Sequence, residues 1–280
     1  MSKRETFEKW QSYLVEKELW AKLSLKAWVR IMAATRNYSF RFDNYLNALI
    51  RYGTYSVDSL MHDFETDTAG KPWPRAAIAD YAGQIADENE MLRSICTDDS
   101  MDTLPTQFKG RTTYADLLSY VEKINKMVQT TYKTFIHYSF PIKREMILYR
   151  GVSSPDQSKF QTEWVGFTST SYKFEIALDF AKTQADAKNQ YAQIYTVRVP
   201  AETRILPIEL CSRWSEHEVV VVSQGVVDII STTTEEDDDD GWNITFINCQ
   251  FSITHDVPSS PKSITPPGLH LFDKKFGYND

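Results

Sequence analysis

The sequence lacks the features that mark several common classes of protein. Among its 280 residues are three cysteines, Cys96, Cys211 and Cys249, widely spaced and without a Cys-x-x-Cys pair. Neither a disulfide framework nor a zinc site is therefore indicated. No apolar run approaches the length needed to span a bilayer, and the N-terminus does not show the pattern of a signal peptide. No Gly-x-Gly-x-x-Gly or phosphate-loop motif is present, which argues against a Rossmann or phosphate-loop nucleotide site.

Positive charge is also in short supply. The formal net charge is -7, whereas binding to nucleic-acid phosphates depends on clustered Lys and Arg. The composition therefore argues against nucleic acid as the main partner. We expect a soluble, monomeric protein without a membrane partner, acting in the cytoplasm where it is made or delivered into the cytoplasm of a target cell.

Two kinds of periodicity divide the chain. Apolar residues recur at helical spacing over residues 20–31, 42–50 and 78–95, and Thr113-x-x-Asp116 resembles a capping box before a stripe that continues to Phe135. After Pro141, short apolar segments predict strands over 146–149, 164–171, 193–199, 204–208, 218–222, 226–231 and 242–253. Helices followed by closely connected strands predict an α+β fold with mainly antiparallel pairing.

We divide the chain into an N-terminal helical region over residues 1–111, a central region over 112–256, and a C-terminal tail over 257–280. The tail is rich in Pro and Ser, and we expect it to be loosely ordered. The acidic run from Glu235 to Asp240, followed by Gly241, is most simply a solvated hairpin turn. A calcium loop is the weaker alternative because the spaced Asp-x-Asp-x-Asp-Gly pattern is absent.

Three short motifs lie at the ends of predicted strands. Arg150 ends one strand in Tyr-Arg-Gly, Ser169-Thr-Ser ends another, and Glu216-His-Glu218 opens a third that continues as four valines. Each motif alone is more often a salt bridge, a strand edge or a solvated strand end. Together they offer a guanidinium fork for a pyrophosphate, hydroxyls that can orient a carboxylate, and a carboxylate that can stabilise positive charge on a departing sugar.

In this order, the motifs resemble those of the mono-ADP-ribosyltransferases of the Arg-Ser-Glu class, which includes C3-like, binary actin-targeting and vertebrate arginine-specific enzymes. The resemblance covers roughly residues 112 to 254 and includes a helix with the pattern Ala177-x-x-Phe180-Ala181. It implies an ADP-ribosyltransferase-like fold, in which two packed, mainly antiparallel sheets form an NAD cleft behind a helical region. Residues 112–256 would then be the catalytic core, with NAD as co-substrate and no metal.

The resemblance also implies roles for individual residues. Arg150 would hold the NAD phosphates, and Ser169 would orient Glu218. Glu218 would bind the 2'-hydroxyl of the nicotinamide ribose and stabilise the oxocarbenium-like transition state as nicotinamide leaves. Further contacts to NAD would come from Gly151, Thr170 and Ser171.

The acceptor side of the implied site lies just before the third strand. Glu216 would orient or deprotonate an incoming guanidinium, since in this family Glu at that position accompanies arginine modification. Trp214 and Ser215 belong to the implied acceptor-recognition loop, where Trp214 is either a stacking surface for the arginine or a partly buried loop residue. The expected function is NAD-dependent mono-ADP-ribosylation of a target protein with an accessible arginine, as a toxin, phage protein or cellular regulator would perform it.

Three alternatives stay open. Water can replace the acceptor, which would make the protein an NAD glycohydrolase, or the acceptor can be nucleic acid. The protein can also be a non-catalytic binding module that retains the fold. The presence of Arg150, Ser169, Glu216 and Glu218 together favours a catalytic protein over such a module.

Overall fold

The computed structural model describes residues 23, 27, 30–31, 33–35, 38, 43–68, 113–188, 190–208, 218–236 and 243–276. The chain divides into two compact units. The first, here called the sheet unit, comprises residues 1–24 and 135–259, and the second, the helical unit, comprises residues 25–134 and 260–280. Residues 135–259 of the sheet unit are thus inserted in sequence between the two parts of the helical unit.

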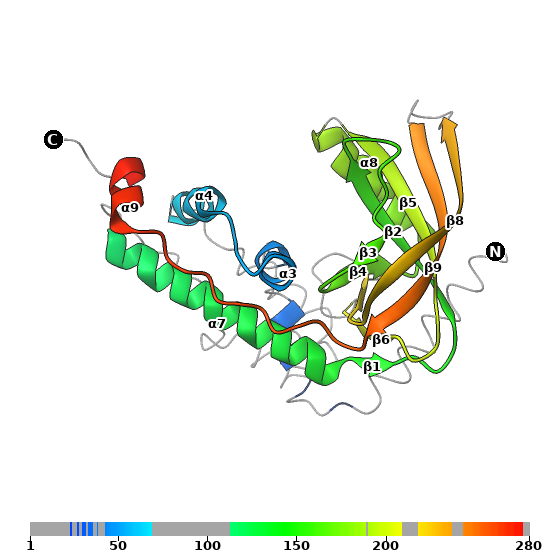
Figure 1. Ribbon diagram of the computed structural model, residues 1–280, viewed down its shortest axis with the longest axis horizontal. Coiled ribbons are helices and arrows are strands. Elements are labelled where there is room, and N and C mark those ends of the chain that lie inside the picture. The colour runs from blue at the N-terminus through cyan, green and yellow to red at the C-terminus, as the bar shows by residue number, and fades with distance from the viewer. Residues whose placement is uncertain are drawn as a thin grey trace, which may run out of the picture. The chain divides into compact units, whose positions relative to one another are not determined.

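The described helices of the helical unit are α3 (Asp43–Arg51), α4 (Val57–Thr68), α7 (Tyr114–Tyr138, of which residues up to 134 belong to this unit) and α9 (Leu269–Phe276) (Figure 1). The structure confirms the predicted helices at α3 and α7. Gly53, with φ of 68°, follows α3 as its predicted stop. Helix α4 was not predicted. The predicted helix over 78–95 lies outside the described residues, and the one over 20–31 is described only in part.

The predicted capping box at the start of α7 is confirmed. The backbone nitrogen and the hydroxyl of Thr113 both donate to Asp116 Oδ2 at 2.7 Å, and the Asp116 nitrogen lies 3.3 Å from Thr113 Oγ1. These bonds satisfy backbone groups that the first turn of a helix leaves without intrahelical partners. The helix begins where its local sequence predicts.

The expectation of a loosely ordered C-terminal tail was wrong for residues 260–276. Asn125 donates to the carbonyl of Ile264 at 3.0 Å and accepts from its nitrogen at 2.7 Å. Gln129 and Tyr114 donate to two further carbonyls of the segment, at 2.8 and 2.7 Å. The Phe272 ring in α9 lies 5.6 Å from that of Tyr114. A Pro-rich segment has few backbone donors of its own, and here side chains of α7 supply them.

The sheet unit contains nine described strands: β1 (Phe140–Pro141), β2 (Met146–Ser154), β3 (Glu163–Trp164), β4 (Thr168–Ser171), β5 (Tyr191–Val199), β6 (Arg204–Pro207), β7 (Glu218–Val221), β8 (Gln224–Glu236) and β9 (Asn243–His255). Their order in space is β1-β6-β7-β4-β2-β5-β9-β8-β3. All described pairings are antiparallel except that of β5 with β9. The predicted α+β class with mainly antiparallel strands is confirmed.

The two expected sheets are joined into one among the described strands. A single residue pair, Tyr149 with Ser171, links β2 to β4 and so connects the β1-β6-β7-β4 half to the rest. One core cluster takes side chains from both halves, including Val219 and Val221 of β7 and Val227 of β8. The halves therefore share a core while meeting at a narrow link.

Two strand predictions need correction. Arg150 lies inside β2, which continues to Ser154, rather than at its end. The predicted strand over 164–171 is two strands, β3 and β4, which occupy different places in the sheet: β3 pairs with β8, whereas β4 lies between β7 and β2. Gly166, with φ of 87°, lies between them. That left-handed conformation, which glycine adopts without strain, turns the chain out of the first strand.

Helix α8 (Phe174–Lys188) packs chiefly against β2 and β5 (Figure 1). A Cβ atom at Gly151 would lie 1.9 Å from the carbonyl oxygen of Ala177 and 2.9 Å from the nitrogen of Ala181. Only glycine therefore allows this approach of the helix to the strand. Ala177 and Ala181 are buried as the sequence pattern suggests, but Phe180 is 49% exposed. No described helix combines the length and apolarity needed to cross a membrane.

Candidate active site

The guanidinium of Arg150 is held against β4. Arg150 is half-buried in β2, and its Nη1 donates to the carbonyl oxygen of Ser169 at 2.6 Å. Its Nε lies 3.4 Å from Oε1 of Gln161. The backbone ladder between β2 and β4 has only the Tyr149–Ser171 pair, so beside it a side chain, rather than a backbone amide, bridges the two strands. This placement fixes a permanent positive charge next to the serine motif.

Glu218 lies at the first position of β7 and directly opposite Ser171 of β4, while Ser169 is opposite Val220. Opposed residues of an antiparallel pair share a face, as do alternate residues of one strand. Ser169, Ser171 and Glu218 therefore share one face. Ser171 is the direct neighbour of Glu218, and Ser169 is a diagonal neighbour at about 7–8 Å between Cβ atoms, within reach of a long side chain.

Glu218 and its direct neighbour Ser171 are both buried. Glu218 is 8% exposed and Ser171 is 5% exposed. Thr170 points to the opposite face, where its hydroxyl donates to the carbonyl of Val219 at 2.6 Å. The nitrogen of Ile208 donates to the Glu218 carbonyl at 3.0 Å, which fixes the strand from its other side. Burial of a carboxylate is costly unless hydrogen bonds or positive charge offset the lost hydration. A buried carboxylate at this position is therefore more easily explained if it binds a ligand or takes part in a reaction.

The three motifs meet at β4. The Ser169 carbonyl accepts a hydrogen bond from the Arg150 guanidinium, and the Ser169 side chain lies on the same face as Glu218. Arg150 approaches from the β2 row that also carries Leu148 and Val152, both in the core cluster. Residues separated by 19 positions (Arg150 and Ser169) thus come into direct contact. The cation of Arg150 and the buried carboxylate of Glu218 thus come from β2 and β7, the two strands that flank the short serine strand β4.

Other predicted site residues have different surroundings. Gly151 faces α8, where it allows close packing. Trp214, Ser215 and Glu216 lie outside the described residues. The implied contacts of all these residues with NAD or an acceptor stay predictions.

Sequence reasoning missed a group of polar residues beside Arg150. Tyr195 of β5 is directly opposite Arg150 and fully buried, and its hydroxyl accepts from the nitrogen of Gln161 at 2.7 Å and donates to Oε1 of Gln193 at 3.3 Å. Burial raises the pKa of Tyr195, while the Gln161 hydrogen bond and the nearby Arg150 act to lower it. A signal was available: Gln193 falls on the apolar row of a predicted strand, where a buried amide needs partners.

No protein-family model matches the chain, and neither does any curated protein. Among solved structures, it is similar to Plx2a, an ADP-ribosyltransferase toxin from Paenibacillus larvae (10% identity over 70% of this chain and 96% of that one, TM-score 0.34). It is also similar to the Vis toxin, an ADP-ribosyltransferase from Vibrio splendidus (17%, 73% and 90%, TM-score 0.30). A third is the C3 exoenzyme of Clostridium limosum (16%, 70% and 95%, TM-score 0.30).

These three proteins belong to the class of enzymes that the sequence motifs resemble.

Proposed function

We propose that the protein transfers ADP-ribose from NAD to an arginine side chain of a target protein, with release of nicotinamide. The observation that carries the proposal is the position of Ser169. Its carbonyl holds the Arg150 guanidinium, and its side chain shares a face with the buried Glu218. A fixed cation and a buried carboxylate, supported by the same strand, suit a ligand with a pyrophosphate at one end and a reacting ribose at the other.

In this proposal, NAD supplies the ADP-ribosyl group and nicotinamide is the leaving group. Arg150 binds the phosphates through its guanidinium. Glu218 accepts a hydrogen bond from the ribose 2'-hydroxyl, and its negative charge stabilises the positive charge that develops on the ribose as the bond to nicotinamide breaks. Hydroxyls of Ser171 and Ser169 keep the carboxylate in one orientation. The residue types therefore match the chemical groups of the co-substrate.

The choice of arginine as acceptor is argued from sequence. Glu216 stands two positions before Glu218, so the two side chains would share a side if the strand extends that far. A carboxylate matches a guanidinium fork and can take its proton as nitrogen attacks the ribose. Trp214 and Ser215 would then complete the acceptor site. A target protein with an accessible arginine is the partner that this chemistry requires.

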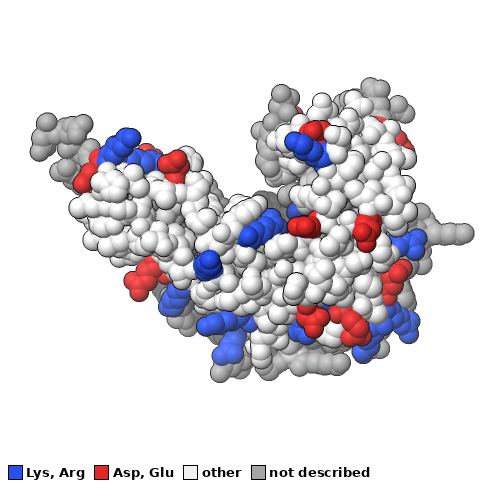
Figure 2. Space-filling view, viewed as in Figure 1, with Lys and Arg blue, Asp and Glu red and all other residues white. Residues whose placement is uncertain are grey.

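Surface charge favours a protein acceptor over nucleic acid. The net charge is -7, and on the face shown in Figure 2 the described Lys and Arg side chains are interspersed with Asp and Glu. Binding to a phosphate backbone draws instead on a continuous basic surface.

The test compares the wild-type protein with Glu218→Gln and Glu216→Gln, each incubated with labelled NAD and a small guanidine acceptor such as agmatine. Glu218→Gln should lower both nicotinamide release and transfer by about 10²–10³-fold, the usual effect of losing an electrostatic partner of the transition state. Glu216→Gln should abolish transfer while leaving much of the NAD hydrolysis. Both rates are measured by separating labelled nicotinamide from labelled adduct.

Glu163→Gln is the matched control, because Glu163 is an exposed glutamate of β3 in the same unit. It should keep wild-type rates. Equal activity of all variants would refute the proposed chemistry, and a wild-type protein that binds NAD without cleaving it would point to a non-catalytic module. Label found in added RNA or DNA and absent from the guanidine acceptor would show that the acceptor class is wrong.

A further inference from the structure

Two hydrogen bonds of the Arg150 side chain join it to different parts of the chain, one to the serine motif and one to the loop before that motif. Its Nη1 donates to the Ser169 carbonyl, while its Nε faces Oε1 of Gln161 at 3.4 Å. An arginine side chain has several rotatable bonds, so one contact leaves much of its conformational freedom. A second contact at Nε restricts the plane of the guanidinium and with it the direction of its other donors.

Gln161 is an exposed residue of the loop over 155–162, yet its backbone is firmly anchored. Its nitrogen donates to the hydroxyl of Tyr195 at 2.7 Å. Tyr195 is fully buried and lies directly opposite Arg150 in the β2–β5 pairing. The tyrosine hydroxyl therefore holds the Gln161 backbone over the face of the sheet from which Arg150 projects.

The Tyr195 hydroxyl is itself held by a second buried residue. It donates to Oε1 of Gln193, which is 1% exposed, and the Gln193 amide nitrogen donates to the carbonyls of Gln157 and Lys159 at 3.2 and 3.0 Å. Hydrogen-bonded amides and hydroxyls in a buried network hold one another in place. Gln193 thus ties the loop to β5 at two points before the chain reaches Gln161.

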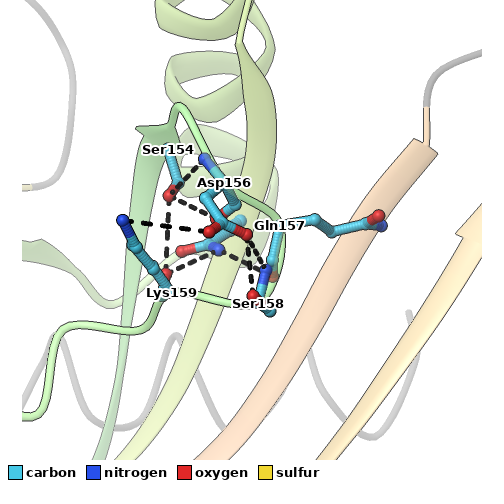
Figure 3. Close-up of polar contacts among 6 residues, drawn as sticks. Ser154, Asp156, Gln157, Ser158 and Lys159 are labelled. Atoms are coloured by element: carbon cyan, nitrogen blue, oxygen red, sulfur yellow. Dashed lines mark hydrogen bonds and ion pairs between the residues drawn. The ribbon is translucent and has the colours of Figure 1, made fainter.

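The first part of the loop is closed by its own contacts (Figure 3). The Ser154 hydroxyl donates to the Asp156 carbonyl at 2.7 Å, and the nitrogen and hydroxyl of Ser158 donate to Asp156 Oδ1 at 2.9 and 2.7 Å. The Ser158 bonds lower the pKa of Asp156 because they stabilise its charged form. The Gln157 side chain points the other way, to Thr245 of β9 at 3.2 Å.

We propose that Gln161 is a positioning residue for Arg150, and that the Tyr195–Gln193 pair is the buried support that keeps it in place. This inference rests on the proposed function, because the orientation of Arg150 matters most if its guanidinium binds the phosphates of NAD. Gln161 acts on Arg150 alone and takes no part in the chemistry. Its loss weakens NAD binding and leaves the step that breaks the nicotinamide bond unchanged.

The test uses the full-length chain and Gln161→Met, which keeps the length of the side chain and removes its oxygen. The Kd for NAD, measured by calorimetry, should rise about fivefold, as expected for one lost hydrogen bond to a charged group that water can partly replace. The kcat of NAD hydrolysis should stay within about twofold of wild type. Gln250→Met in β9 is the matched control and should change neither value.

A second readout does not depend on NAD. The Nε proton of Arg150, identified by the loss of its NMR signal in Arg150→Lys, should exchange with solvent faster in Gln161→Met than in wild type. Gln161→Glu keeps the acceptor and should keep the slow exchange, while its NAD affinity falls because the new carboxylate offsets the guanidinium charge.

The outcomes separate this inference from the function on which it rests. A wild-type protein that neither binds nor cleaves NAD overturns both. A wild-type protein that binds NAD, together with unchanged affinity and unchanged proton exchange in Gln161→Met, overturns the role of Gln161 alone. An equal fall in kcat and affinity also overturns it, since that would show a part in the chemistry or a general loss of structure.

Discussion

The sheet unit and the helical unit are held together in different ways. In the sheet unit, backbone ladders connect one strand to the next, and buried polar side chains, such as Gln193 and Tyr195, bond to loops between those strands. In the helical unit, side chains of α7 bond to the backbone of a segment more than a hundred positions later, as Asn125 does with Ile264. Each unit is built from two stretches of the chain, and residues 135–259 of the sheet unit separate the two parts of the helical unit.

The two units therefore depend on different kinds of residues for their stability. All described site residues lie in the sheet unit, where strand pairing and the hydrogen bond from Arg150 to Ser169 bring Arg150, Ser169 and Glu218 together. The helical unit depends on residues 260–276, whose composition by itself predicts little order. Point changes should therefore disturb the two units separately, and this separation can be tested by substitutions, from the largest expected effect to the smallest.

Gly151→Ala should be the most damaging of these changes, and its effect should be confined to the sheet unit. The added Cβ would lie 1.9 Å from a backbone oxygen of α8, which can be relieved only if the helix or the strand moves. We expect the free energy of unfolding to fall by about 3 kcal/mol or more, at the upper end of the cost of overpacking. Urea unfolding measures the loss, and limited proteolysis with mass spectrometry should show cleavage within residues 135–259 first.

Gly53→Ala in the helical unit is the matched control. Its φ of 68° disfavours alanine, but the nearest atoms, 3.0–3.2 Å from the added Cβ, belong to the flexible side chain of Lys262. The expected cost is about 1 kcal/mol. If Gly53→Ala proved the more damaging change, or if Gly151→Ala opened the helical unit first, the proposed contrast between the units would be wrong.

Asn125→Leu should loosen the helical unit. It leaves both the nitrogen and the carbonyl of Ile264 without the partners they have in the structure, which should cost about 2 kcal/mol. Proteolysis should then reach residues 260–276 sooner than in wild type, while NAD hydrolysis per folded molecule stays unchanged. Lys133→Ala, an exposed change on the same helix, should have an effect within about 0.5 kcal/mol. A loss of hydrolysis in Asn125→Leu would show that the units do not behave separately.

Sequence reasoning succeeded where the deciding interactions are local. The capping box of Thr113 and Asp116 lies within four residues, and helix α7 begins where those residues predict. Strands β5, β6, β7 and β9 were found because their sequences are short apolar or alternating runs, several of them rich in β-branched residues. The left-handed Gly53 ends α3 for an equally local reason.

It failed where the deciding contact is distant in sequence. Register between β4 and β7 decides that Ser171, rather than Ser169, is directly opposite Glu218, and no pattern within either strand contains that information. The separation of β3 from β4 depends on different partner strands. Gln161 has no motif at all, because its anchoring hydroxyl belongs to Tyr195, 34 positions later.

The smallest expected effect concerns alkaline pH, where the sheet unit should weaken before the helical unit. Burial raises the pKa of the Cys249 thiol in β9 from 9.0 to about 12. Because the folded protein favours the protonated thiol, this stabilisation is complete below pH 9 and is lost as pH rises from 9 towards 12. The corresponding group in the helical unit is Tyr45, whose pKa is raised above 10.0 by burial, by Tyr120 and by its bond to Asp63.

Between pH 9 and 10, the free energy of unfolding should therefore fall by about 1 kcal/mol in wild type because of Cys249. Urea unfolding of wild type and Cys249→Ala at both pH values isolates this contribution, since the variant keeps Tyr45 and every other titrating group. The fall should be absent or much smaller in Cys249→Ala, whatever its stability at pH 8. An equal fall in the free energy of unfolding of both proteins would show that a group other than Cys249 causes the loss of stability. Alkaline pH would then not distinguish the two units.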